Sequence, residues 1–177
     1  SLLVANEGEP SDDYQVDPEG SVSVISLANL KAPIVRTADF KAFNGREAAL
    51  REQGIRIFGP KASAAQDFEP EYITVSKDGK TAWVTLQENN ALAKIDVAAA
   101  KVLAVYPFGF KDHGINGHGL DVSDADGVDG KGKINIQTWA NVRGLYMPDA
   151  IASFEVAGKT YICLLYTSDA ADDMQCV

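Results

Sequence analysis

The clearest pattern of hydrophobic and polar positions along the chain lies between residues 69 and 106. Apolar and polar residues alternate there in short runs, with the period of two that is typical of β-strands with one buried face. Turn-forming segments separate the runs, among them Ser76–Lys80 with its Asp-Gly pair. The pattern predicts four antiparallel strands joined by tight turns, at residues 72–75, 81–86, 91–96 and 101–106. Four such strands in this length are the size of one β-propeller blade.

Parts of this pattern recur along the chain. The alignments pair residues 70–73 with 148–151, 79–81 with 158–160, 3–8 with 84–89, and 20–26 with 91–96. Repeated units of this kind bury their faces by stacking on their neighbours. The predicted fold class is therefore all-β: a β-propeller fragment of about two to three four-stranded blades with a short helical insertion. The alternative is a generic antiparallel β domain in which the similarity arose by chance.

Residues 39–68 depart from the strand pattern and form the predicted insertion. Asn44 is expected to be the N-cap of a helix over residues 48–53, with Glu47 as its capping-box partner and Gly54 ending it. No residue in this segment has catalytic spacing. We expect a lid or a packing element that connects two blades.

Composition narrows the function classes. The chain has 177 residues, a net charge of −9 and 46% hydrophobic residues, as expected for a globular protein. It has no Lys/Arg cluster to neutralise phosphates, so we expect no nucleic-acid binding. No apolar run approaches the roughly 20 residues that a membrane-spanning helix needs. The chain begins in mid-strand without an initiator Met, so we expect a fragment of a longer, metagenomic sequence.

The segment from Cys163 onward resembles a translated sequencing adapter. We expect residues 163–177 to be adapter-derived read-through and residues 1–162 to be the partial propeller. Both cysteines, Cys163 and Cys176, lie in this tail. Residues 1–162 therefore predict neither a disulfide framework nor a thiol nucleophile.

One group of candidate metal ligands lies in an aspartate-rich loop. Its members are Asp121, Asp124, Asp126 and Asp129. The loop fails the EF-hand template in both registers, because the first ligand would be Val122 or Ala125. Two interpretations stay open: a looser Ca²⁺ loop, or an Asx-rich connection without an ion.

A second group of candidate metal ligands occupies matching places in the repeated units. Glu7 and Glu88 follow the second strand of their units, and Glu71 and Asp149 lie just before the predicted first strand of theirs. A propeller brings equivalent positions of successive blades together around its axis.

Glu7 also belongs to an acidic loop, residues 6–14, whose side-chain oxygens could gather around a hard cation such as Ca²⁺. Within this loop Glu7 is a better candidate than Asp12 and Asp13, for which a solvated position is the safer interpretation.

His113 and His118 are the only histidines, and both lie in a Gly-rich loop. Two histidines five residues apart could be metal ligands or general bases. We favour a turn-forming or packing role, because the sequence identifies no partner that would orient either ring.

Long segments of the chain resemble the choice-of-anchor I domain family. They are VANEGEPSDDYQVDPEGSVSVI, QDFEPEYITVSKDGKTAWVTLQENNALAKIDV, FGFKDH, LDVSDADG, INI and MPDAIASFEVAGKTY. The resemblance implies a secreted, surface-anchored bacterial β-propeller, in a group with some members labelled alkaline-phosphatase-like. The segments are also similar to mesenchyme-specific cell-surface glycoproteins of biomineralising animals. An extracellular, cell-surface or periplasmic location follows from the resemblance, and so does attachment through a C-terminal anchor.

Two functions are therefore predicted. The favoured one is a calcium-associated surface module that binds a surface polymer, a mineral or another partner. The alternative is a metal-dependent, alkaline-phosphatase-like phosphoester hydrolase that uses the axial carboxylates and Ca²⁺ or another divalent metal. Against the alternative, the sequence offers no nucleophile, and the arginines lie elsewhere in the sequence than these carboxylates: Arg46, Arg51, Arg56 and Arg143.

Overall fold

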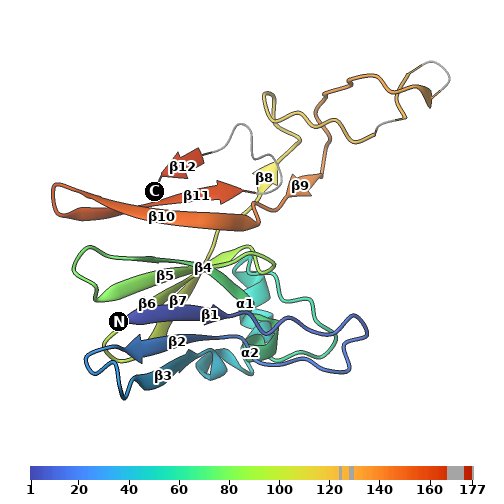
Figure 1. The fold of residues 1–177 in the computed structure, drawn as a ribbon. Helices are drawn as coiled ribbons and strands as arrows, with labels where there is room; N and C mark the ends of the chain where they lie inside the picture. Colours follow the sequence, from blue (N-terminus) through green and yellow to red (C-terminus); the bar gives the residue numbers. More distant parts are fainter. Residues whose placement is uncertain (124, 128–129, 167–173, 177) are drawn as a thin grey trace. The chain divides into compact units, whose positions relative to one another are not determined.

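The alternating segment forms the four strands that it predicts. In the computed structural model, β4 (Pro70–Val75), β5 (Thr81–Leu86), β6 (Ala91–Asp96) and β7 (Lys101–Pro107) make one antiparallel sheet in the order β4-β5-β6-β7 (Figure 1). β4 begins two residues earlier than predicted, because Pro70 already pairs with Leu86. The inward-facing residues Ala82, Val84 and Ile95 are completely buried.

The structure describes residues 1–123, 125–127, 130–166 and 174–176. The chain divides into two compact units. The first unit comprises residues 1–108 and 147–177, and the second comprises residues 109–146.

Two further sheets complete the first unit. β1 (Leu2–Asn6), β2 (Ser21–Ser26) and β3 (Ile34–Asp39) form one of them, in the order β1-β2-β3. β10 (Pro148–Val156), β11 (Lys159–Tyr166) and β12 (Met174–Cys176) form the other. β11 continues beyond residue 162, the predicted end of the partial propeller. Cys163 lies opposite Cys176 in the pairing of β11 with β12 and is disulfide-bonded.

The hairpins β4–β5 and β10–β11 share one pairing register. In both, the proline pairs with the far end of the second strand, and a register shift separates it from the isoleucine three residues later. The pairs are Pro70–Leu86 with Ile73–Val84, and Pro148–Tyr166 with Ile151–Leu164.

The all-β fold class is confirmed. The residues that the structure describes form one four-stranded, two three-stranded and one two-stranded sheet, and these close into neither a barrel nor a propeller ring. The number of propeller blades therefore stays a prediction.

The insertion is helical, as predicted, but its capping differs from the prediction. It contains η1 (Lys41–Phe43), α1 (Glu47–Glu52) and α2 (Ala64–Asp67). Asn44 does not cap α1, whose N-cap is Arg46 without a side-chain hydrogen bond. The capping box lies instead at Ser63 and Gln66 of α2. The Asn44 side chain accepts a hydrogen bond from a backbone N–H of α2 at 2.9 Å, so it caps a helix distant in sequence.

The insertion packs into the core. Phe40, Phe43 and Phe68 form an aromatic cluster, with ring centroids 5.2 Å apart for Phe40 and Phe68. Ile55 and Ile57 are buried in the same core. None of the helices in the described residues is long and apolar enough to cross a membrane.

The second unit contains little regular structure. β8 (Lys111–Asp112) pairs with β9 (Arg143–Gly144), and Leu120 forms an isolated bridge with Gln137. The Trp139 indole N–H donates to the Leu120 carbonyl at 2.8 Å.

Candidate cation site

Gly20 brings two carboxylate-bearing segments of the first unit together. Its N–H donates to the Ala65 carbonyl at 2.9 Å. A Cβ at this position would lie 1.9 Å from the Phe68 carbonyl oxygen and 3.0 Å from the Glu7 carbonyl oxygen. Only glycine allows this close approach of three backbones. The approach places Glu7, which follows β1, near Glu69, which precedes β4.

Asn89 ties a third carboxylate-bearing segment to this place. Its side chain is completely buried, and its amide N–H groups donate to the carbonyl oxygens of Asp67 at 2.7 Å and Arg56 at 2.9 Å. Its amide oxygen accepts a hydrogen bond from the Glu69 N–H at 3.2 Å. One buried amide therefore fixes the turn that carries Glu88 against the segment that carries Glu69.

The three segments surround an open depression of about 370 Å³, which we call the acidic pocket. Five carboxylates line it, and no Lys or Arg side chain is among its described lining residues. Two aromatic residues belong to its wall. The lining residues are Glu7, Glu9, Pro10, Ser11, Asp12, Tyr14, Phe58, Glu69 and Glu88.

Glu69 is the most deeply buried carboxylate of the acidic pocket. It is 5% exposed, and its side chain has no hydrogen-bond or ion-pair partner among the described residues. Burial, and after it the charges of Glu88 and Glu7, together raise the pKa of Glu69 to about 7. A buried carboxylate without a partner is unfavourable when it is ionised.

Glu88 has a similar environment. Its Oε2 atom is buried and has no hydrogen-bond partner among the residues that the structure describes. Burial raises the pKa of Glu88, as does the charge of Glu7, while Arg56 lowers it.

Glu71, on β4, lies beside the same group of charges. Burial, and after it the charges of Glu88, Glu7 and Asp149, together raise the pKa of Glu71 to about 7. With its nitrogen turned toward Glu71, the Gln87 amide lies 2.6 and 3.2 Å from the two carboxylate oxygens. Glu71 thus lies within electrostatic range of the other three carboxylates that the repeats single out, Glu7, Glu88 and Asp149.

The inference that no arginine lies beside these carboxylates is wrong for Arg56. Its Nη1 donates to the Glu88 carbonyl oxygen at 2.9 Å. The guanidinium carbon lies 3.7 Å from the centroid of the Phe58 ring, a cation–π contact at the wall of the acidic pocket. Arg56 and Glu88 are far apart in sequence, and the buried Asn89 side chain holds their two segments together.

The aspartate-rich loop belongs to the other unit. The Asp121 carboxylate accepts hydrogen bonds from the backbone N–H groups of Ser123 at 3.4 Å and Asn135 at 3.0 Å. The Asn135 side chain donates to Asp126 at 2.8 Å. Asp124 and Asp129 lie outside the described residues. Ile134 and Ile136 follow as exposed residues without strand structure.

The two histidines pack within the second unit. His113 is buried, and its Nδ1 lies 2.8 Å from the His118 carbonyl oxygen. The His118 Nδ1 lies 3.2 Å from the Asp112 carbonyl oxygen. Both rings thus hydrogen-bond to the backbone of their own loop, as residues that stabilise a turn do.

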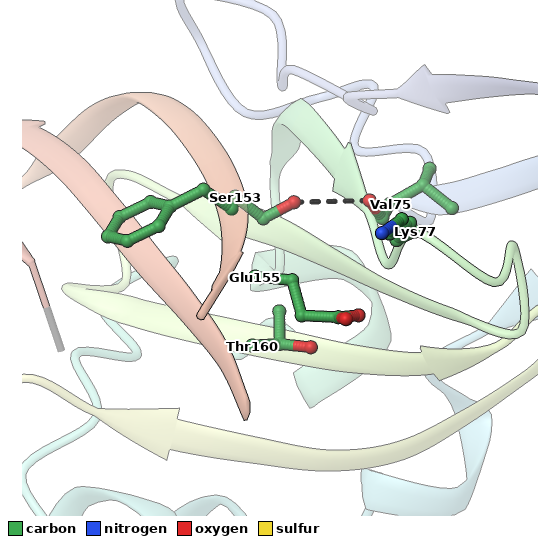
Figure 2. A pocket seen from close by; sticks show the side chains of 6 residues that line it. Val75, Lys77, Ser153, Glu155 and Thr160 are labelled. Carbon is green, nitrogen blue, oxygen red and sulfur yellow. Dashed lines mark hydrogen bonds between the residues drawn. The ribbon is translucent and has the colours of Figure 1, made fainter. Parts of the chain in front are cut away.

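A second cavity, of about 250 Å³, lies where the end of β4 meets the β10–β11 hairpin. The Ser153 hydroxyl donates to the Val75 carbonyl at 3.1 Å across this junction (Figure 2). Lys77 and Glu155 contribute opposite charges to its lining, so the cavity does not concentrate charge of one sign.

Among the described residues, no three Asp, Glu, His or Cys side chains are already arranged to hold a metal ion. The sequence singles out neither Glu69 nor Asn89, whereas Glu9 belongs to the acidic loop of residues 6–14. The available signal for Glu69 was its position directly before Pro70, in a segment next to a repeated unit. The burial of Asn89 has no signal in the sequence, because Asn in a turn is commonly exposed.

Comparisons with known proteins place the chain in a family. The family model for the choice-of-anchor I domain matches residues 1–170, which is nearly the whole chain. No curated protein and no solved structure matches the chain. The chain therefore belongs to the choice-of-anchor I domain family.

Proposed function

We propose that this chain is part of a cell-surface module that binds a divalent cation, Ca²⁺ in the first instance, in the acidic pocket. The observation that carries the proposal is Glu69: the residue as a whole is only 5% exposed, it lines the acidic pocket, and its carboxylate has no partner among the described residues. The family supports the location, since choice-of-anchor domains belong to surface-anchored bacterial proteins.

The chemistry of the pocket supports a hard cation. Ca²⁺ takes six to eight oxygen ligands, largely from carboxylates, hydroxyls, carbonyls and water. Glu69, Glu88 and Glu7 supply carboxylates from three segments, and Ser11 adds a hydroxyl to the lining. A bound cation would neutralise the repulsion among these charges and link the β1–β3 sheet to the β4–β7 sheet.

The carboxylates are not yet arranged as a coordination shell. Like charges without a cation between them repel, so their side chains separate. Coordination therefore requires rotation of the glutamate side chains, while Gly20 and Asn89 keep their backbones in place. We accordingly expect moderate affinity and a clear gain in stability on binding.

Calorimetric titration of the metal-free chain with Ca²⁺ tests the proposal. Glu69→Gln and Glu88→Gln should each weaken binding at least tenfold, since each removes a ligand charge but keeps the side-chain size. Glu52→Gln is the matched control, because Glu52 is an exposed carboxylate on α1 outside the pocket. Equal binding by all three variants would place the cation elsewhere.

Asp121→Asn combined with Asp126→Asn separates the two predicted cation sites. Binding that is lost in this variant but kept in Glu69→Gln would move the site to the aspartate-rich loop. Binding that is unchanged assigns the cation to the acidic pocket.

One observation favours phosphoester hydrolysis as a second candidate function. The Arg56 guanidinium, behind the pocket lining, bonds the Glu88 backbone carbonyl and stacks on Phe58 of the wall, and from there it could turn to bind a phosphoryl oxygen next to a bound cation. Hydrolysis of p-nitrophenyl phosphate in the presence of Ca²⁺ or Zn²⁺ that is lost in Arg56→Met would support it. Absence of turnover under conditions in which the cation binds would exclude hydrolysis of this substrate.

A further inference from the structure

The strand β1 has one open edge. β2 pairs with its other edge from Leu2–Ile25 to Asn6–Ser21. β4 lies near β1 without pairing with it, and no other described strand pairs with the open edge. Leu2 and Val4 are 49% and 38% exposed. An unpaired strand edge presents free N–H and C=O groups to any extended chain that fits.

The other sheets of the first unit show what fits at this position. Residues 3–8 align with residues 84–89, so β1 corresponds to β5. Leu3, like Val84, packs against the core, which supports the same alignment in space. The edge of β5 that corresponds to the open edge of β1 is covered by β4, and the equivalent edge of β11 is covered by β10.

The two covering strands have the same form. Each begins with a proline, continues with an acidic residue and places an isoleucine after the same register shift. Proline suits this place, because the missing N–H is tolerated at a strand start or a bulge. On β1, the corresponding partners are Ala5 for the proline and Leu3 for the isoleucine. The acidic residue falls in the register shift between the proline and the isoleucine. From that place on β4 the Glu71 carboxylate reaches Gln87 and is close to Glu88, which correspond to Asn6 and Glu7.

We infer that the open edge of β1 binds an extended segment of the form Pro-(Asp/Glu)-x-Ile in antiparallel register. Backbone hydrogen bonds supply the affinity, and the isoleucine supplies a core-facing contact next to Leu3. The acidic residue adds a carboxylate to the acidic pocket beside Glu7, as Glu71 does beside Glu88. Binding of the segment at β1 goes beyond the proposed function. The role of its acidic residue as an added ligand rests on the proposed function, because it requires a cation in the acidic pocket.

A peptide taken from the chain itself tests the docking. A fluorescent peptide of residues 69–76 is titrated with the 177-residue chain, with a scrambled peptide of the same composition as control. We expect saturable binding at least tenfold tighter than that of the scrambled peptide, together with slowed amide exchange confined to Leu2–Asn6. Equal binding of the two peptides, or protection elsewhere only, would overturn the inference.

Proline substitutions in β1 separate docking from folding. Successive N–H groups of a strand point to opposite edges, so Val4→Pro and Ala5→Pro remove N–H groups on different sides. One variant loses a bond to β2, while the other loses only an open-edge donor and should keep its thermal midpoint. We expect the folded variant to bind the peptide at least tenfold more weakly. Unchanged binding by that variant would contradict docking at this edge.

Two further measurements distinguish the remaining outcomes. In the absence of peptide, protection of the β1 amides from hydrogen exchange could grow with protein concentration. This result would show that a second copy of the chain occupies the open edge, and it would overturn the inference. With Ca²⁺, the peptide should bind more tightly than its Glu71→Gln version, and without Ca²⁺ it should bind no more tightly than that version, because the added carboxylate is then repelled by the pocket charges. Docking without this Ca²⁺ effect would refute the added carboxylate while the docking at β1 stands.

Discussion

Neutralising Glu69 should stabilise the metal-free protein at alkaline pH. The pKa of Glu69 rises from 4.5 to about 7 on folding, because of burial and then the charges of Glu88 and Glu7. At about 1.4 kcal/mol for each tenfold change in proton affinity, this rise corresponds to a cost of about 3 kcal/mol for the ionised group. Since the pocket opens to solvent, which screens the charges, we expect about 2 kcal/mol in practice.

The sign follows from proton binding. Between pH 4.5 and about 7 the folded protein binds more protons at Glu69 than the unfolded chain does. The free energy of unfolding therefore falls as pH rises through this window and levels off above it. Glu69→Gln removes this pH-dependent contribution, because the glutamine side chain does not titrate.

Urea unfolding in calcium-free buffer, followed by the fluorescence of Trp83 on β5, measures the effect. At pH 8 the Glu69→Gln variant should be more stable than the parent chain by about 2 kcal/mol, and at pH 4 the two should be nearly equal. Glu52→Gln should show no such pH-dependent difference. A Glu69→Gln variant that is less stable at pH 8, or a difference independent of pH, would refute the reasoning.

Three structural predictions concern the residues that build the pocket. Asn89→Ala should lower the free energy of unfolding by about 3 kcal/mol, because it leaves buried groups of Asp67 and its neighbours unpaired; a loss below 1 kcal/mol in urea unfolding would contradict this role. Gly20→Ala should prevent stable folding. Gly45→Ala, at a position with open space and a positive φ, should lower the free energy of unfolding by only about 1 kcal/mol, and similar thermal midpoints for the two variants would refute the close approach at Gly20. Ser63→Ala should cost about 1 kcal/mol through loss of the capping box, and an unchanged midpoint would show that the cap contributes little.

The strands and their order in the central sheet could be predicted from the sequence, because alternation and turn residues are local signals. β5 and β6 have the predicted bounds. The cap of the insertion could not be predicted, since Asn44 and Glu47 bind the first turn of α2, about 20 residues away, instead of their own helix. A local capping motif cannot reveal a partner that only the tertiary fold brings near.

The candidate site was predictable in part for the same reason. The repeats singled out Glu7, Glu71, Glu88 and Asp149, and the structure brings the other three within electrostatic range of Glu71. The repeat alone could not identify Glu69 as the most deeply buried carboxylate of the pocket, because its burial depends on Gly20 and on the contacts of Asn89.

Terbium luminescence is the most direct test of a cation in the acidic pocket. Tb³⁺ replaces Ca²⁺ at oxygen-rich sites, and a nearby tyrosine sensitises its emission; Tyr14 lines the pocket. We predict sensitised emission that Ca²⁺ displaces, that Tyr14→Phe reduces with little loss of affinity, and that Glu69→Gln abolishes at the same Tb³⁺ concentration. Emission that is unchanged in both variants would contradict the account, because the ion would then lie outside the acidic pocket.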